Sequence, residues 1–379
     1  MKVRMNVCVA AVASLYLGIA GAQEVVRIGH VAAISGASAH IGKDNENGAR
    51  MAIEELNAKG VVIGGKKVHL ELVAEDDASD PRQAAAAAQK LVDENVNGVV
   101  GHQQSGTSIP ASRIYSDAGI PQISPSATNP KYTRQKYKTT FRVVADDVQL
   151  GGGLARYALK DPQLKAFAVI DDRTAYGQGL ADEFTKAVKA AGGNVVDRQF
   201  TTDKATDFSA ILTGMKAKKP DVVFYGGMDA VAGPMLRQMK QLGISAKFMG
   251  GDGVCTTSLP RLAAGAMADD QVICAEAGGV DEAGKPALEK FRSDFKKRFN
   301  AEVQVTSPYA YDAVKVMVAA MVKAGSADPK VYLPVLARTD GYEGVTGVIS
   351  FDEKGDLKDG ALTIYTFRGG QRTQIAVTR

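Results

Sequence analysis

The stretches GVVGHQQSGTS (residues 98–108) and PQISPSATNP (residues 121–130) each join a short apolar run to a loop rich in hydroxyl groups. The apolar runs are typical of buried strands, and both loops lead towards helical segments. In an open sheet of parallel strands such loops meet at the carboxyl edge, where ligands bind. Because the first amides of a helix are unpaired, Ser105 and Thr128 could hold a carboxylate; equally, each could simply cap its helix.

The same alternation of β-branched runs and amphipathic segments extends in both directions from these loops. Residues 25–31 form the first predicted strand, and Ala49, Ala52, Ile53 and Leu56 mark the buried face of the next helix. Later strands are predicted at residues 67–73, 166–170, 194–196, 221–225, 247–250 and 271–274, with a hairpin at residues 362–377. This repeated order predicts an α/β fold with two lobes of similar size.

Composition narrows the possible functions. The chain has 379 residues, 45% hydrophobic and 23% charged, which fits two globular domains. Its 46 basic and 42 acidic residues are mixed along the sequence, so nothing points to nucleic acid or a membrane surface. With four histidines, no HExxH, no G-x-S-x-G and no intact phosphate or dinucleotide loop, we expect no metal, no cofactor and no enzyme activity.

Residues 1–22 have the pattern of a secretory signal peptide. Lys2 and Arg4 precede an apolar run over residues 5–20, and Ala20-Gly21-Ala22 supplies small residues for cleavage. The run is shorter than the roughly 20 residues of a spanning helix. We therefore expect an exported, periplasmic protein that is not inserted in the membrane.

Export changes how two cysteines are interpreted. In an oxidising compartment Cys255 and Cys274 could form a disulfide that closes a loop of about 20 residues. They could also be two buried free thiols, and the sequence leaves both possibilities open.

Nine segments, read in order, resemble the periplasmic leucine/isoleucine/valine-binding proteins of ABC importers. They are SGASAHIGKDNENGARMAIEELNAKG, EDDASDPRQAAAAAQKLV, GHQQSGTSIPAS, ISPSATNP, DDRTAYGQGLA, DFSAIL, VVFYGG, FMGGDGV and FDEKGDL, between about residues 25 and 360. The resemblance implies a type I periplasmic binding protein fold, in which two Rossmann-like lobes joined by a three-crossover hinge close on a ligand.

The lobes that this resemblance implies are discontinuous in sequence. The N-terminal lobe would comprise residues 23–144 and 277–350, and the C-terminal lobe residues 145–276 and 351–379. The crossovers are expected near residues 143–147, 275–279 and 350–353.

The same resemblance implies a clamp for an amino-acid zwitterion. On the first lobe, Ser105, Ala127 and Thr128 would hold the α-carboxylate, and the carbonyl of Ser126 would receive the α-ammonium. On the second lobe, Tyr176 would close over the ligand. Asp252 would pair with the ammonium group, although it is one methylene shorter than the family's glutamate.

Three expected pocket positions depart from the family pattern. Ile41 and Met228 stand where aromatic residues are common, and Gln103 stands where an aliphatic residue is common. A family disulfide near the cleft is also replaced, with Ser79 and Gln104 at its two positions.

The function implied is a monomeric solute-binding protein that captures a small L-amino acid and delivers it to an ABC permease. Leucine, isoleucine and valine are the first candidates for the ligand. Another amino acid, an amide or an aromatic acid is the alternative within this class, because of Gln103 and Met228. A secreted hydrolase is the alternative from another class.

Overall fold

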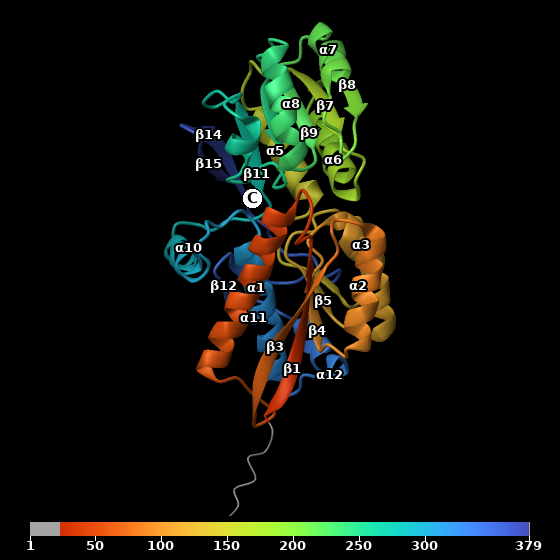
Figure 1. The fold of residues 1–379 in the computed structure, drawn as a ribbon, viewed down its shortest axis with the longest axis vertical. Coiled ribbons are helices and arrows are strands. Elements are labelled where there is room, and N and C mark those ends of the chain that lie inside the picture. Colours follow the sequence, from red (N-terminus) through yellow and green to blue (C-terminus); the bar gives the residue numbers. More distant parts are fainter. Residues whose placement is uncertain (1–22, 379) are drawn as a thin grey trace, which may run out of the picture.

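The computed structural model describes residues 23–378, so the expected signal peptide lies outside the described residues. Two α/β lobes are stacked along the long axis of the molecule (Figure 1). Each lobe has its own central sheet, and the strand orders of the two sheets contain the crossovers of a doubly wound fold. The predicted α/β class with two lobes is confirmed.

The first lobe is built on a six-stranded sheet of order β2-β3-β1-β4-β5-β6, parallel except for the β2–β3 pair. Its strands are β1 (Glu24–Ala32), β2 (Val62–Ile63), β3 (Lys66–Asp76), β4 (Gly98–Gly101), β5 (Gln122–Ser124) and β6 (Thr140–Arg142). Its helices are α1 (Ala39–Lys59), α2 (Pro81–Asp93), α3 (Ser105–Ala118), α4 (Lys131–Arg134), α10 (Lys285–Phe299), α11 (Ser307–Ala324) and α12 (Pro329–Leu336). Helices α1 and α11 cover one face of the sheet, and α2 and α3 cover the other (Figure 1).

The second lobe is built on a seven-stranded sheet of order β15-β14-β11-β10-β9-β7-β8. Its strands are β7 (Ala166–Asp171), β8 (Asn194–Phe200), β9 (Val222–Gly226), β10 (Lys247–Gly250), β11 (Val272–Glu276), β14 (Leu362–Arg368) and β15 (Gln371–Thr378). The helices are α5 (Asp147–Ala158), α6 (Ala175–Ala190), α7 (Ser209–Ala217), α8 (Asp229–Gln241) and α9 (Leu259–Ala263). Strands β14 and β15 form the predicted hairpin, which extends the sheet in the antiparallel sense.

Local sequence signals account for several of these boundaries. Strand β4 is a continuous buried run, as expected for a strand covered on both faces. Helix α2 starts where the sequence places an N-cap and a proline: the Asp80 carboxylate accepts hydrogen bonds from the amides of Arg82 and Gln83, and Pro81 opens the helix.

Three segments connect the lobes. The first runs from β6 to α5 and the second from β11 to α10. The third follows the hairpin of β12 (Tyr342–Gly344) and β13 (Gly347–Ile349).

The third connection contacts the first lobe beyond β13. Phe351 packs on Phe141 of β6, with ring centroids 5.1 Å apart, and the Gly355 carbonyl accepts a hydrogen bond from the Arg142 amide. Asp356 also bonds Arg142 and Thr133. These contacts hold the turn at residues 351–356 against the first lobe.

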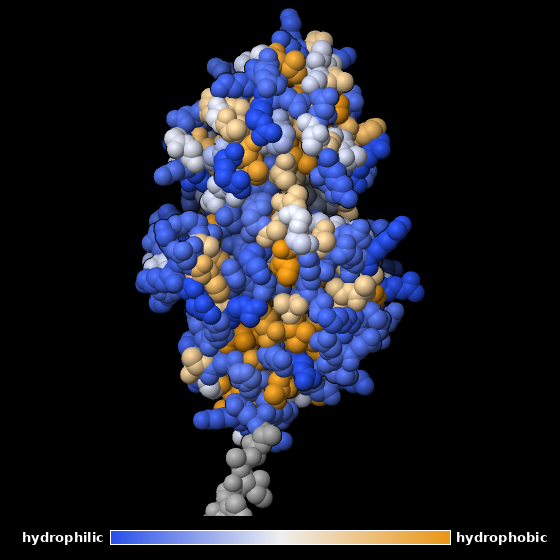
Figure 2. Space-filling view, in the orientation of Figure 1, coloured by the Kyte–Doolittle hydropathy of each residue, from blue (hydrophilic) through white to orange (hydrophobic). Residues whose placement is uncertain are grey.

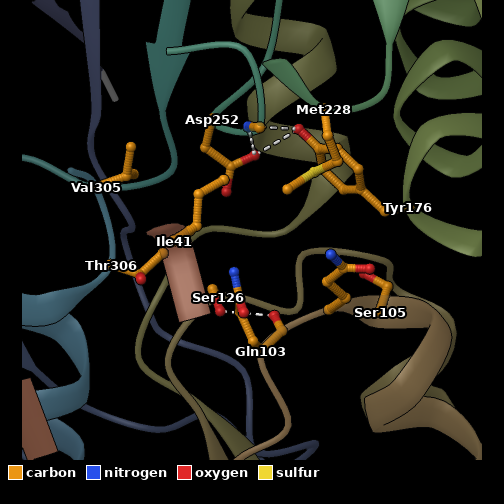
Figure 3. Close-up of a pocket in the computed structure, with 11 residues that line it drawn as sticks. Ile41, Gln103, Ser105, Ser126, Tyr176, Met228, Asp252, Val305 and Thr306 are labelled. Carbon is orange, nitrogen blue, oxygen red and sulfur yellow. Dashed lines mark hydrogen bonds between the residues drawn. The ribbon is translucent and has the colours of Figure 1, made fainter. Parts of the chain in front are cut away.

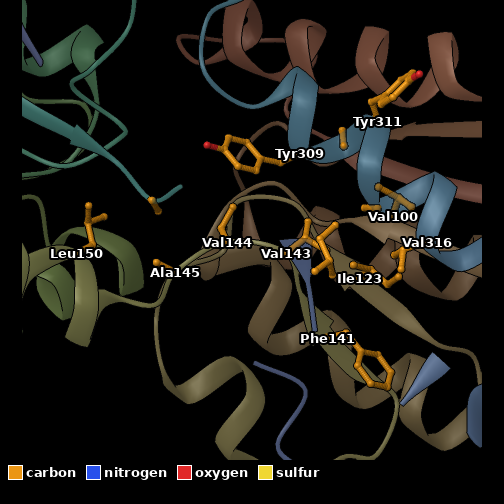
Figure 4. Packing of buried hydrophobic residues seen from close by; sticks show 14 of the residues in the cluster. Val100, Ile123, Phe141, Val143, Val144, Ala145, Leu150, Tyr309, Tyr311 and Val316 are labelled. Atoms are coloured by element: carbon orange, nitrogen blue, oxygen red, sulfur yellow. The ribbon is translucent and has the colours of Figure 1, made fainter. Parts of the chain in front are cut away.

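Hydrophobic packing continues through the first connection. Val143, Val144 and Ala145 lie between the first sheet, represented by Phe141, and Leu150 on α5 (Figure 4). All five side chains are buried. The lobes are thus joined by a packed segment rather than by a free linker. Within residues 23–378, no helix combines the length and the apolar character needed to cross a bilayer.

Candidate functional site: a cavity between the lobes

A cavity of roughly 350 Å³ lies where the two lobes meet (Figure 3). Both lobes line it. The first lobe contributes Ile41, Gln103, Gln104, Ser105, Ser126, Val305 and Thr306, and the second contributes Tyr176, Met228, Asp252 and Gly253. Seven of the nine sequence-predicted ligand residues are in this lining.

The first-lobe wall is formed by the two loops that follow β4 and β5. Ser105 is the first residue of α3, and its Oγ accepts a hydrogen bond from the Asn129 amide at 3.1 Å. The Ser126 hydroxyl donates to the Gln103 carbonyl at 2.6 Å, so the two loops brace each other. The first amides of α3 and its dipole make this wall suited to an anion such as a carboxylate.

Ala127 and Thr128 do not line the cavity. Both are completely buried in the loop directly behind Ser126. The Ala127 carbonyl accepts a hydrogen bond from Arg142 Nη1 at 2.6 Å, and this contact ties the loop to the end of β6. Their direct contact with a ligand stays a prediction.

Opposite this wall, the second lobe presents Asp252 and Tyr176 (Figure 3). Asp252 follows β10, and its Oδ1 accepts hydrogen bonds from the Tyr176 hydroxyl at 2.6 Å and from the Gly253 amide at 3.1 Å. Burial raises the pKa of Asp252 to about 6, against the hydrogen bond from Tyr176, which lowers it. An ammonium group beside Asp252 would offset the cost of burying its charge.

Burial of Asp252 predicts that affinity for an ammonium-bearing ligand falls in acid. The ionised acid pairs with the ammonium, so binding is strongest above the pKa of about 6 and weakens as protonation sets in below it. Between pH 7 and pH 5 this group alone should weaken binding about tenfold. Calorimetric titration across this range checks the prediction, and an Asp252→Asn variant should show no such pH dependence.

The stability of the ligand-free protein changes with pH in the opposite direction to its affinity for the ligand. Burial favours the protonated acid, so ionising Asp252 as the pH rises from its ordinary pKa of 3.8 to about 6 lowers the stability of the empty protein. Thermal unfolding with and without ligand would separate the two effects. Equal pH profiles for the two states would contradict this role of Asp252.

Asp147 is a buried acid outside the cavity lining, and the sequence analysis did not identify it. It opens α5 at the first connection and is completely buried. Both its carboxylate oxygens and Thr128 Oγ1 have no hydrogen-bond partner of regular geometry, although the Thr128 hydroxyl is close enough to lower the pKa of Asp147. Burial has the larger effect and raises this pKa well above its usual range, and the nearby charge of Asp252 acts in the same direction.

The remaining walls are mostly apolar. Ile41 and Met228 face the cavity with Val305 and Thr306 of the loop before α11 (Figure 3). No local sequence signal identifies Val305 or Thr306, because they lie about 200 residues after the first-lobe loops. Gln103 is 3% exposed, and its Oε1 has no hydrogen-bond partner.

The two positions that replace the family's cleft disulfide are still linked. Gln104 Nε2 donates hydrogen bonds to Ser79 Oγ at 3.0 Å and to Ser38 Oγ at 3.3 Å. A polar contact therefore joins the same two loops at the edge of the cavity.

A disulfide joins Cys255 and Cys274 in the second lobe. It connects the loop that carries Asp252 to strand β11, and both cysteines are fully buried. Of the two possibilities that the sequence left open, the structure therefore has the bonded form.

Removing this disulfide should lower the free energy of unfolding. Because the bridge closes a loop with a sequence separation of 19 residues, the double variant Cys255→Ser/Cys274→Ser should lose about 3 kcal/mol. Thermal unfolding of oxidised protein, reduced protein and the variant measures this. An unchanged unfolding temperature in all three would contradict a structural role for the bridge.

No three histidine, cysteine, aspartate or glutamate side chains in the described part of the chain are grouped to hold a metal ion. The cavity instead combines an anion-binding helix terminus on one side with an acid on the other, across mainly apolar walls. Two lobes with such a cavity between them are typical of the ligand-binding proteins whose lobes close about a hinge.

The chain belongs to the family described as "Periplasmic binding protein", whose pattern matches residues 25–371. It is 34% identical over 376 residues to the leucine-specific-binding protein of Salmonella typhimurium, covering 99% of this chain and 100% of that protein. It is 35% identical over 355 residues to the leucine-, isoleucine-, valine-, threonine-, and alanine-binding protein of Pseudomonas aeruginosa, covering 93% of each.

A solved structure shares the arrangement. The branched-chain amino acid transporter substrate binding protein LivJ of Streptococcus pneumoniae, in complex with isoleucine, superposes with a TM-score of 0.83. It is 26% identical, and the match covers 94% of this chain and 99% of that one. The resemblance found in the sequence and the fold it implies are confirmed.

Proposed function

We propose that this protein is a periplasmic solute-binding protein of an ABC importer that captures leucine, isoleucine or valine between its lobes. One observation carries the proposal: Asp252 and Tyr176 face Ser105 and Ser126 across a small cavity with apolar side walls. The ligand's ammonium would pair with Asp252. Its carboxylate would accept hydrogen bonds from the Ser105 hydroxyl and from the first amides of α3.

The comparisons support the same ligand class. The Salmonella and Pseudomonas relatives are named for binding leucine and other small amino acids, and the Streptococcus structure holds isoleucine. Ile41, Met228 and Val305 would surround an aliphatic side chain. On this proposal the chain is exported by residues 1–22, acts as a monomer, passes its ligand to a permease and catalyses no reaction.

Gln103 favours a second candidate ligand class. Its buried Oε1 has no partner, and leaving such a group unpaired beside an aliphatic ligand costs about 1–3 kcal/mol. A ligand with a hydrogen-bond donor on its side chain, such as threonine or a small amide, would satisfy it. Gln103→Leu should then improve leucine binding relative to threonine.

A ligand screen tests the proposal. Protein unfolded, freed of ligand and refolded is heated with each of the twenty amino acids, small amides and aromatic acids. We expect L-leucine, L-isoleucine or L-valine to raise the unfolding temperature most, and D-leucine and 4-methylpentanoate to raise it little. Stabilisation by none of the amino acids would overturn the proposal, and a ligand recovered chemically changed would favour a hydrolase.

A further inference from the structure

Helix α1 contacts the second lobe directly at the edge of the cavity. The Nε2 atom of His40, in the first turn of α1, lies 2.7 Å from Oδ2 of Asp229, the first residue of α8. The two residues are 189 positions apart and belong to different lobes. The N-terminal end of α1 points at the second lobe, and atoms of the two lobes meet along the middle of this face (Figures 1 and 2).

The acid in this contact is positioned by its own lobe. Asp229 is completely buried, its amide donates to the Gly253 carbonyl at 2.8 Å, and its Oδ2 also accepts the Thr256 hydroxyl. The His40 side chain is 25% exposed. Asp229 Oδ2 therefore has one partner from its own lobe, Thr256, and one from the first lobe, His40, whereas Asp229 Oδ1 has no hydrogen-bond partner.

A second contact crosses between the lobes from the loop before α11. Gln304 Oε1 accepts hydrogen bonds from Thr257 Oγ1 at 2.9 Å and from Ser258 Oγ at 3.3 Å. Gln304 belongs to the first lobe, whereas Thr257 and Ser258 belong to the second.

Asp44, one turn after His40 on α1, fixes this loop. Its carboxylate is buried and accepts the amides of Gln304 at 3.0 Å and of Thr306 and Ser307 at 2.8 Å each. The same helix therefore makes the first contact through His40 and supports the second through Asp44.

Three of the five contact residues are next in sequence to a residue of the cavity wall. His40 precedes Ile41, Asp229 follows Met228, and Gln304 precedes Val305. Separation of the lobes at this edge would break both contacts and carry those walls apart, so a bound ligand leaves only after the contacts open.

We propose that the His40–Asp229 pair and the Gln304 contact with Thr257 and Ser258 form an interlobe latch that sets how long the closed protein holds its ligand. This rests on the proposed function, since a latch of this kind acts on a captured solute. The latch residues hold the lobes together without touching the ligand, so they are positioning residues. They control the rate of ligand release more than the rate of capture, as contacts formed after encounter do.

The test measures release of radiolabelled L-leucine after addition of excess unlabelled leucine. His40→Ala should release leucine about five- to tenfold faster, the scale of one ordinary hydrogen bond, because the His40 side chain is 25% exposed. Gln304→Ala should act in the same direction by about two- to fivefold. In both variants, the association rate and the unfolding temperature of the ligand-free protein should stay near the wild-type values. A general structural defect would change them. His69→Ala, at an exposed position on β3 away from the cavity, is the matched control.

A double-mutant cycle assigns the effect to the pair. Asp229→Asn alone should speed release, and His40→Ala added to it should have little further effect, because the two side chains act through one contact. Wild-type release rates in both single variants, or full additivity in the double variant, would overturn the latch. If wild-type protein binds leucine in no assay, the proposed function fails, and the latch proposal fails with it.

Discussion

Asp252→Asn should weaken binding of L-leucine at pH 7 by at least about thirtyfold. The substitution keeps the size of the side chain but removes the charge opposite the ammonium, and truncating a partner of a buried, hydrogen-bonded charge pair costs about 2 kcal/mol or more. Asp252 is held in place by the Tyr176 hydroxyl and the Gly253 amide, and no other acid lies in its loop at residues 251–258 to replace it. Calorimetric titration measures the effect.

Two controls isolate the charge. Asp203→Asn, at an exposed acid of the same lobe, should leave leucine affinity unchanged. With 4-methylpentanoate, which has leucine's carbon skeleton but no ammonium group, the Asp252→Asn variant should bind as well as the wild type or better. Equal leucine affinity in Asp252→Asn and wild type would remove Asp252 from the site.

Arg142→Met should lower the stability of the first lobe strongly and disturb the loop behind Ser126. Arg142 is completely buried, and its Nε donates to Asp356 Oδ1 at 2.7 Å. Its other nitrogens donate to the carbonyls of Ala127 and Asn129. Removing the guanidinium leaves a carboxylate and two loop carbonyls without their donor, a change that costs about 3–5 kcal/mol.

Thermal unfolding and leucine titration of the same variant measure both effects. Arg134→Met is the matched control, because Arg134 lies 2.8 Å from Asp146 but is 42% exposed, and such pairs contribute about 0–1 kcal/mol. We expect Arg142→Met to unfold well below Arg134→Met and to bind leucine more weakly. Equal unfolding temperatures for the two variants would show that Arg142 does not brace the loop.

The sequence predicts best where buried apolar residues follow one period. Strand β4 is an unbroken buried run, and the apolar face from Ala49 to Leu56 predicts the second half of α1. The first half of α1, from Ala39 to Gly48, has no such face because buried polar side chains such as Asp44 interrupt it. That half carries the proposed latch, so the pattern is weakest where the helix serves the cleft.

Two other helix boundaries depend on contacts with residues that are distant in sequence. Helix α3 begins at Ser105, although the glycine and serine residues in its first turn have a low helix propensity. Its first turn is held by the neighbouring loop, where Ser105 Oγ accepts the Asn129 amide. Helix α12 was not predicted; it is short and contains Pro334, and it is held by packing of Tyr332 and Leu336 in the core.

Some residues of the candidate site can be proposed from the sequence, and others cannot. The loops after β4 and β5 carry hydroxyls at strand ends, so Ser105 can be proposed from its own segment, whereas Asp252 is proposed only through the resemblance to the family. Val305 and Thr306 enter the cavity because Asp44 bonds the backbone of their loop, and Asp147 looks like a solvated residue at a helix start. Neither feature has a signal within its own segment of sequence.

A crystal structure of the protein with L-leucine tests the central claim most directly. We predict leucine in the cavity between the lobes, with its ammonium about 3 Å from the Asp252 carboxylate and its carboxylate at Ser105 and the first amides of α3. Leucine bound outside this cavity, or bound with its carboxylate towards Asp252, would contradict the account.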